Sequence, residues 1–420
     1  MRNRSIYKLA AFLIMPGLVF AAVPSDSNMQ KQLLELKEQN RELKLDMRKL
    51  SKSYRVQSSV LQNYRRFAGD RFIEVNALNK VDTGKTGFNA SNPSWSPDGA
   101  YLSFDRSDQT SREIVIMDKN NTIIHSVSYE VDEDMAELDS LLPELSDNTY
   151  FNTGISWSSN SKDFVYVSNG TEGNYDLYQG NITNGKAIRL TTHDEKEGHA
   201  RWSPTRNEIV FVSGRTGNAN LFIINLTNKK VHQITHSKQS SIYPDWRPTG
   251  NHIVFTHGKN LNHDIAIIEN SGGKSKISRL VSSPFDDVRP VWSMDGSKIA
   301  FYTNIGTDQG KWSLVVIPYK ENTPTIKNLD DYIVADNVIP NIETGPSWTR
   351  DSQSIVYVKK DEKNFNPIHI VNTQSGVDAL LMTNTRINND INISSKNELA
   401  FRSQLNQWDT VYKVTIPGSK

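Results

Sequence analysis

The sequence predicts an all-β fold, a β-propeller, preceded by an α-helical coiled coil. Three observations predict this arrangement. A tryptophan-anchored segment recurs along residues 69–420, a heptad pattern occupies residues 22–68, and an apolar leader covers residues 1–21. The recurrence is decisive for the fold, because a period of about 40 to 45 residues is typical of one propeller blade.

The repeat has a fixed order of residue types. Its first copy reads Pro93-Ser94-Trp95-Ser96-Pro97-Asp98-Gly99 and is followed by an apolar stretch. The anchor returns as Trp157, Trp202, Trp246, Trp292, Trp348 and, in a degenerate copy, Ile393. Successive anchors lie 62, 45, 44, 46, 56 and 45 residues apart. This spacing predicts seven blades with two insertions, and six blades is the alternative if the last copy is irregular.

Each copy predicts four strands. Pro-Asp-Gly and its variants favour a tight turn with a residue at positive φ, so the anchor strand and the next strand form a hairpin. Third and fourth strands follow, as at residues 220–224 and 231–234. The last copy ends after its third strand, at residues 410–414, so we expect residues 72–75 to supply its fourth and close the ring. The regular anchors are expected to pack between blades.

This pattern resembles the repeats of the TolB propeller and of the propeller domains in prolyl oligopeptidase-like enzymes, from about residue 70 to residue 420. No Gly-x-Ser-x-Gly motif is present in the sequence, so the peptidase resemblance implies a fold and no activity. The TolB family is six-bladed and carries an α/β domain where this chain has the heptad segment. The family's partners, the lipoprotein Pal and the TolA protein, are therefore not carried over.

The heptad segment predicts self-association. Its seam is formed by Leu33, Leu36, Asn40, Leu43, Met47, Leu50, Tyr54 and Leu61, with Gln57 and Tyr64 continuing the spacing. Asn40 occupies the first seam position, where a buried amide selects register and oligomer state. A parallel dimer is the favoured outcome and a trimer the second. The alternative is that this helix packs on the propeller of its own chain or on another protein.

The first residues predict export. Arg2, Arg4 and Lys8 precede the apolar run 9–23, and the small residue Ala21 offers a cleavage site. The run is shorter than the roughly 20 apolar residues that a spanning helix needs, so a retained anchor is the weaker alternative. The chain has no cysteine, which excludes a lipobox, disulfides and thiolate metal sites. We expect a periplasmic protein.

The net charge argues against nucleic acid as a partner, and the local charge distribution indicates two charged segments. The formal net charge of +1 gives no basic footprint for nucleic acid. Residues 29–66 carry ten Lys or Arg against four Asp or Glu, and residues 130–147 carry eight acidic residues and no basic one. Each patch is either a docking surface for an opposite charge or a solvated face. The acidic segment lengthens the first repeat. The second insertion, at residues 320–341, is a further candidate docking surface or a loop without a binding role.

A binding site is predicted at one mouth of the central channel, from polar residues three and five positions before the anchors. These are Asn92, Asn152, Glu197, His199, Tyr243, Asp287, Arg289, Glu343, Asn388 and Asp390. Their mixed chemistry suits a peptide segment, a cation or a small polar ligand. The alternative is that they only bond between blades and to channel water. No cofactor is expected, although a divalent cation bound in the channel stays open.

Two functions are consistent with this sequence. The first is a non-catalytic periplasmic scaffold that oligomerises through its coil and binds envelope proteins or peptides with its propeller. The second is a metal-dependent polysaccharide lyase, because the repeat type also resembles that of oligogalacturonate lyases. Such a metal site usually needs several histidines, and only His199 falls on the predicted mouth.

Overall fold

The computed structural model describes Gln39, Lys44 and residues 72–416, apart from 76–77, 85–86, 109–110, 129–149, 171–173, 270–275, 306–310, 362 and 406–407. The predicted signal peptide, the coiled-coil seam and the acidic segment 130–147 therefore lie outside the described residues. Internal contacts divide the chain into two units, residues 1–62 and 63–420, and the fold below is that of the second unit.

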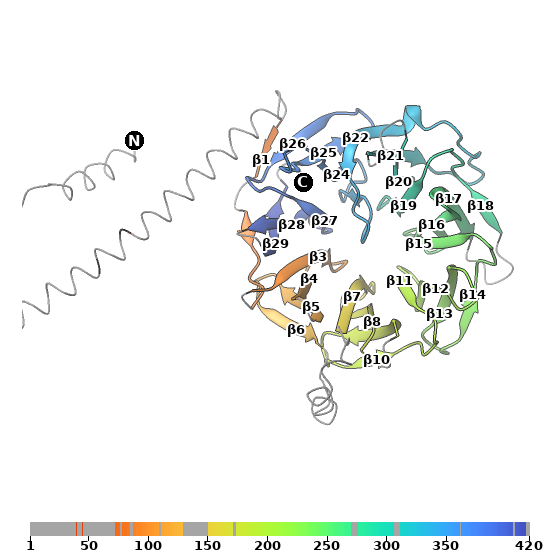
Figure 1. The fold of residues 1–420 in the computed structure, drawn as a ribbon, viewed down its shortest axis with the longest axis horizontal. Helices are drawn as coiled ribbons and strands as arrows, with labels where there is room; N and C mark the ends of the chain where they lie inside the picture. Colours follow the sequence, from red (N-terminus) through yellow and green to blue (C-terminus); the bar gives the residue numbers. More distant parts are fainter. Residues whose placement is uncertain are drawn as a thin grey trace, which may run out of the picture. The chain divides into compact units, whose positions relative to one another are not determined.

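Antiparallel strand groups follow one another around a ring (Figure 1). The first half of the ring contains β3 (Asn89–Trp95), β4 (Tyr101–Ser107), β5 (Ser111–Asp118) and β6 (Ile123–Val127), then β7 (Tyr150–Trp157), β8 (Asp163–Ser168), β9 (Asp176–Asn181) and β10 (Ala187–Arg189), then β11 (Glu197–Trp202), β12 (Glu208–Ser213), β13 (Asn220–Asn225) and β14 (Val231–Gln233). A short parallel pairing of β5 with β7 joins the first two of these groups into one sheet.

The second half of the ring repeats the pattern. It contains β15 (Ser240–Trp246), β16 (His252–Lys259), β17 (Asn262–Glu269) and β18 (Ile277–Arg279), then β19 (Asp287–Trp292), β20 (Lys298–Thr303), β21 (Trp312–Pro318) and β22 (Ile333–Ile339), then β23 (Ser347–Trp348), β24 (Ser354–Lys359), β25 (Ile368–Asn372) and β26 (Asp378–Met382), and last β27 (Asn389–Ile393), β28 (Glu398–Leu405) and β29 (Trp408–Thr415). The all-β propeller architecture predicted from the repeat is confirmed, including the hairpin, third and fourth strands of every copy but the last, which has three strands of its own.

The ring closes through a different segment from the one predicted. Residues 72–75 were expected to complete the last group, but β1 (Phe72–Glu74) pairs in parallel with β26, one group earlier. The strand that pairs with β29 is β2 (Asn79–Lys80). The reason is packing: Ile73 lies against the core shared by the last two groups, while Val81 is fully buried and donates its N–H to the Val411 carbonyl at 3.0 Å.

The turn after each anchor is built by its own side chains. Ser96 Oγ donates to Asp98 Oδ1 at 2.7 Å, and the same carboxylate accepts the Ala100 N–H at 2.9 Å. Gly99 then takes φ of 63°, a conformation in which a residue without Cβ is unstrained. Ser293 and Asp295 repeat this arrangement. The predicted tight turn with a residue at positive φ is therefore confirmed.

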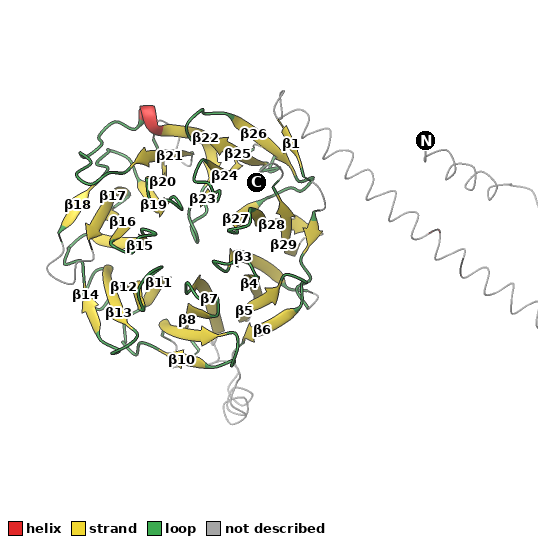
Figure 2. Ribbon diagram, turned by 180° about the vertical axis from the view of Figure 1, so that it is seen from behind, coloured by secondary structure: helices red, strands yellow, loops and turns green. Residues whose placement is uncertain are grey.

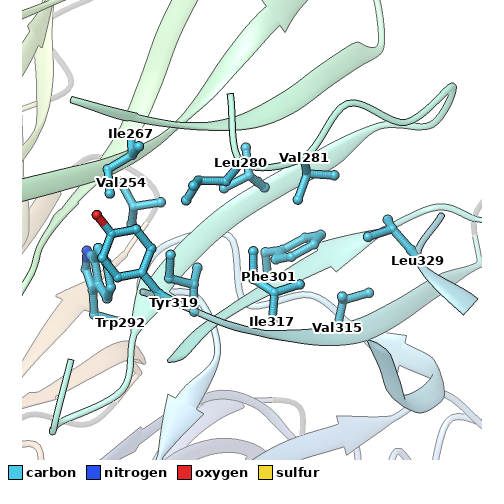
Figure 3. Packing of buried hydrophobic residues seen from close by; sticks show 12 residues of the cluster. Val254, Ile267, Leu280, Val281, Trp292, Phe301, Val315, Ile317, Tyr319 and Leu329 are labelled. Carbon is cyan, nitrogen blue, oxygen red and sulfur yellow. The ribbon is translucent and has the colours of Figure 1, made fainter. Parts of the chain in front are cut away.

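The anchors pack between groups, as the sequence predicted. Trp292 ends the first strand of its group, yet it lies in one core with Val254 and Ile267 of the preceding group (Figure 3). Its ring meets Tyr319 edge to face, with ring centroids 4.8 Å apart. Every anchor, Ile393 included, is at most 8% exposed. Each sheet thus buries an apolar face that it could not bury alone.

The insertion at residues 320–341 is more ordered than its polar composition indicated. Ile326 forms a parallel bridge with Val281, and Leu329 is buried in the core around Trp292. The 3-10 helix η1 (Asp330–Tyr332) follows, and β22 then pairs with both β21 and β24. This segment therefore fastens three successive groups together. Within the described residues, no helix has the length and apolar character needed to span a bilayer.

Replacement of Trp292 by alanine tests the role of the anchors. The variant leaves a cavity between two groups and should lower the free energy of unfolding by about 3 to 5 kcal/mol. The shift in the urea unfolding midpoint measures this loss. Trp408→Ala is the matched control, because Trp408 is 45% exposed and should change stability little. Equal shifts for the two variants would contradict the packing role of Trp292.

Candidate functional site

The inner strand of each group lies nearest the centre of the ring (Figure 2). Three residues before each anchor, the main chain of these strands takes positive φ. The residues are Asn92 (51°), Gly154 (72°), His199 (49°), Tyr243 (56°), Arg289 (62°), Gly345 (80°) and Asp390 (49°). The pairing register shifts across this position in β3, β7, β11, β15, β19 and β27.

These register shifts are β-bulges, which re-aim a side chain out of the sheet. Only glycine adopts positive φ freely, so each non-glycine residue at the bulge holds a conformation that costs energy. Outliers of this kind gather at functional sites. The repeated bulge therefore marks one level of the channel at which side chains from separate groups can meet.

Three of the bulge residues meet across neighbouring groups. The rings of His199 and Tyr243 pack edge to face with centroids 4.5 Å apart. The guanidinium carbon of Arg289 lies 4.3 Å from the centroid of the Tyr243 ring, in a cation–π contact. The sequence placed these three residues at one mouth, and the structure brings them into contact.

Burial, with the charges around it, decides the protonation of His199. Burial, then the positive charges of Arg289 and Arg201, lower the pKa of His199 to about 3, so its imidazole is neutral at neutral pH. Burial, then the Arg201 charge, lowers the pKa of Arg289 to about 9, so Arg289 remains a cation. The positive charge of the cluster therefore lies on Arg289, and Arg201 adds a second positive charge beside it.

Two further bulge residues are held by partners on neighbouring strands. Asn92 Nδ2 donates to Asp105 Oδ2 at 2.8 Å, and Thr153 Oγ1 of the next group donates to the same oxygen at 2.7 Å. Asp390 forms an ion pair with Arg402 at 2.7 Å. Burial raises the pKa of Asp105 to about 7, against the lowering effect of these hydrogen bonds.

The residues five positions before the anchors do not join this cluster. Asn152, Glu197, Asp287 and Asn388 are buried, and each has a hydrogen-bond or ion-pair partner. Glu197 forms an ion pair with Arg215, and Asp287 accepts a hydrogen bond of 2.7 Å from Ser283 Oγ. Asn152 and Asn388 donate to main-chain carbonyls. These four residues are not among those lining the channel cavity, whereas Glu343, alone exposed in this set, lines it.

A cavity of about 410 Å³ occupies the channel. Its walls come from segments widely separated in the sequence, among them Asn92 on β3, Arg201 on β11 and Glu343 before β23. Five large apolar side chains, namely Trp95, Ile155, Trp157, Met294 and Ile393, also line it, and four serines, Thr344 and Asn392 add further polar groups. Met294 is 51% exposed. Large apolar side chains beside polar groups that can fix a ligand's orientation are typical of a binding site for a small ligand or a peptide side chain.

The sequence analysis missed the residue directly before each anchor. In three cases this side chain accepts the main-chain N–H of the next anchor around the ring: Ser156 from Trp202 at 3.0 Å, Asp245 from Trp292 at 2.8 Å, and Asn392 from Trp95 at 3.0 Å. Arg201 occupies the same position in β11. This position is visible in the repeat, but the predicted site included only the positions three and five residues before each anchor.

Other parts of the described chain are weaker candidates for a functional site. Among the described residues, no group of three His, Asp or Glu side chains is arranged to hold a metal ion. A cavity of about 380 Å³ lies beside β16 and β17, and its charged side chains Asp264 and Arg279 are paired with each other at 3.3 Å. The channel therefore holds the best candidate site in the described part of the chain.

Comparison with known proteins supports the architecture. A family model described as the TolB beta propeller domain matches residues 137–320 and 200–420. An oligogalacturonate lyase from Vibrio parahaemolyticus is 13% identical, with a TM-score of 0.57, over 83% of this chain and 99% of that chain. An oligogalacturonate lyase in complex with manganese is 12% identical, with a TM-score of 0.58 and the same coverage.

TolB from Acinetobacter baumannii is 15% identical with a TM-score of 0.47, and the match covers 68% of this chain and 64% of that chain. No curated protein sequence matches. At these identities the lyases show a shared fold and nothing about activity, and the TolB structure adds no argument of its own.

The buried carboxyl of Asp105 predicts a pH dependence. Its pKa is raised from 3.8 to about 7 in the folded protein, so between these values the folded chain binds more protons than the unfolded chain. Asp105 therefore makes its full contribution to the free energy of unfolding below about pH 4. This contribution is lost as the pH rises through 7. Asp105→Asn should abolish this part of the decline. Urea unfolding of both proteins at several pH values between about 4 and 8 measures it, and parallel curves would contradict it.

Proposed function

The chain belongs to the TolB β-propeller domain family, and on that premise we propose that it is a non-catalytic binding scaffold of the bacterial cell envelope. The observation that carries the proposal is the channel cavity, to which separate strand groups contribute apolar side chains, Arg201 and Glu343. Side chains held by separate strands around one cavity form a rigid recognition surface. We place the protein in the periplasm, as its leader predicts, and count seven blades, with β2 completing the last one.

Assembly through residues 22–68 is part of the same proposal. A parallel coil would bring two propellers together, and two linked sites bind a multivalent partner more tightly than one. A partner with exposed carboxylates suits the arginines of the channel. The Glu130–Asp147 segment is the second proposed docking surface, for a basic partner.

Deletion of residues 22–68 tests the assembly. We expect the full mature chain to elute as a dimer, or as a trimer, and the deleted chain as a monomer, measured by light scattering on a gel-filtration column. Crosslinking of both proteins in the native envelope should then recover a defined set of envelope proteins that depends on the coil. A monomeric full chain would refute the proposed oligomerisation, and recovery of no specific protein would refute the scaffold.

The channel mouth can be tested separately, because the chain has no cysteine and an introduced thiol is unique. A bulky maleimide attached to Met294→Cys should block the cavity and abolish most partner recovery. Val377→Cys is the matched control, since Val377 is also apolar and exposed, at 41%, and is not among the residues lining the cavity. If both labelled proteins recover the partner equally, the binding surface lies outside the channel.

A metal-dependent polysaccharide lyase is the second candidate. The observation that favours it is the shared fold with two oligogalacturonate lyases, each covered over 99% of its length. His199 would be the channel histidine of such an enzyme, and its neutral imidazole is able to bind a cation. Cleavage of oligogalacturonate by the purified protein with added manganese, lost in His199→Ala, would replace the scaffold proposal.

A further inference from the structure

The loop of residues 340–346, between β22 and β23, enters the channel. Glu343 and Thr344 line the cavity together with residues of β3, β7 and β27. Figure 2 shows a loop beside β23 that reaches toward the centre of the ring. We call residues Asn341–Gly345 the channel loop.

The channel loop is built to hold one shape. Asn341 Oδ1 accepts the main-chain N–H groups of Glu343 and Thr344, both at 3.1 Å. Asn341 Nδ2 donates to Thr344 Oγ1 at 2.7 Å and to the Ile391 carbonyl at 3.2 Å. Gly345 has φ of 80°, and a Cβ there would lie 2.5 Å from Val291 Cγ2. Asn341 is therefore the residue that closes the loop and fastens it to β27.

Two arginines hold the loop by its main chain. Arg201 donates to the Glu343 carbonyl at 2.9 Å. Arg289 donates to the carbonyls of Ile342 and Glu343, and it is only 3% exposed. Among the described residues, neither arginine forms an ion pair. A buried guanidinium that bonds only to neutral carbonyls lacks the stronger, charge-assisted bonds that a carboxylate would supply.

The Glu343 side chain supplies negative charge nearby without pairing. It is exposed and forms no ion pair within the described part of the chain, yet it is close enough to act on the charges of Arg201 and Arg289. The arginine pair thus faces two peptide carbonyls and the unpaired carboxylate of Glu343, and the buried carboxyl of Asp245 also acts on both arginine charges. A short acidic peptide lying in the channel would present the same chemistry.

We infer that the channel loop is an internal occupant of a carboxylate-binding site formed by Arg201 and Arg289, and that an acidic peptide segment of a partner must displace it to bind there. This inference rests on the proposed binding function of the channel and adds its regulation. While the loop competes, only a fraction of the molecules have a free site. The apparent affinity for the partner equals the intrinsic affinity multiplied by this fraction. Binding is therefore tunable by anything that loosens the loop.

The test uses the full mature chain and a capped peptide with the loop sequence Asn-Ile-Glu-Thr-Gly, titrated by calorimetry. Asn341→Ala removes the hydrogen bonds that close the loop and should bind the peptide about five- to tenfold more tightly than the wild type. Asn372→Ala is the matched control, because Asn372 Oδ1 closes a similar turn in the same group, through the N–H groups of Gln374 and Ser375. It should bind as the wild type does.

Two additions make the result specific. Arg201→Gln in the Asn341→Ala background should cancel the gain, and a peptide with Gln in place of Glu should bind more weakly. If Asn341→Ala lowers the melting temperature far below that of the control, Thr344→Val serves instead, since it removes only the 2.7 Å bond within the loop.

Equal peptide affinity of wild type, Asn341→Ala and Asn372→Ala would show that the loop does not compete, and would overturn the inference. Absence of peptide binding in every variant would overturn it as well, because the arginine pair would then not accept an acidic segment. Neither outcome decides the scaffold proposal, which depends on partner recovery from the envelope and its block at Met294→Cys.

Discussion

The packing of each anchor on the preceding strand group is the interaction on which the rest of the structure depends. Each group presents apolar faces that water would otherwise contact, and the next group covers them with its anchor. Because Trp95 packs against Ala400 and Val411 of the last group, the series has no uncovered end. The position of every inner strand, and hence the channel, follows from this repeated contact.

The bulges in the inner strands then bring side chains from different groups together at one level of the channel. A regular inner strand would keep its side chains above and below the sheet, whereas a bulge at the same place in most inner strands re-aims one residue of each. The residue types at this level are free to differ, because the main chain sets the geometry. That freedom explains how His199, Tyr243 and Arg289 form one cluster although each belongs to a different group.

The propeller was predictable because its signals are local and repeated. An anchor, a turn and an apolar strand all lie within about twenty residues of sequence. The spacing between anchors then matches the length of one propeller blade. The closing strand was misassigned because residues 72–75 and 79–81 are both compatible with a sheet edge, and only the packing of Ile73 and Val81 decides between them. Glu343 was among the predicted mouth residues, but Arg201 and its bond to the channel loop escaped prediction, because that contact joins residues distant in the sequence.

The closure of the ring also sets an order of folding. The Trp95 N–H reaches Asn392 across 297 residues, and β2 pairs with β29 near the other end of the chain. A chain made from its N-terminus can stack one group on another as each emerges, but the face beside Trp95 and the partner of β2 arrive last. Until then the nascent protein exposes an apolar surface and an unpaired strand, which a second copy can capture. Such non-local closure is slow, so the ring is most vulnerable to exchange between chains in its final step.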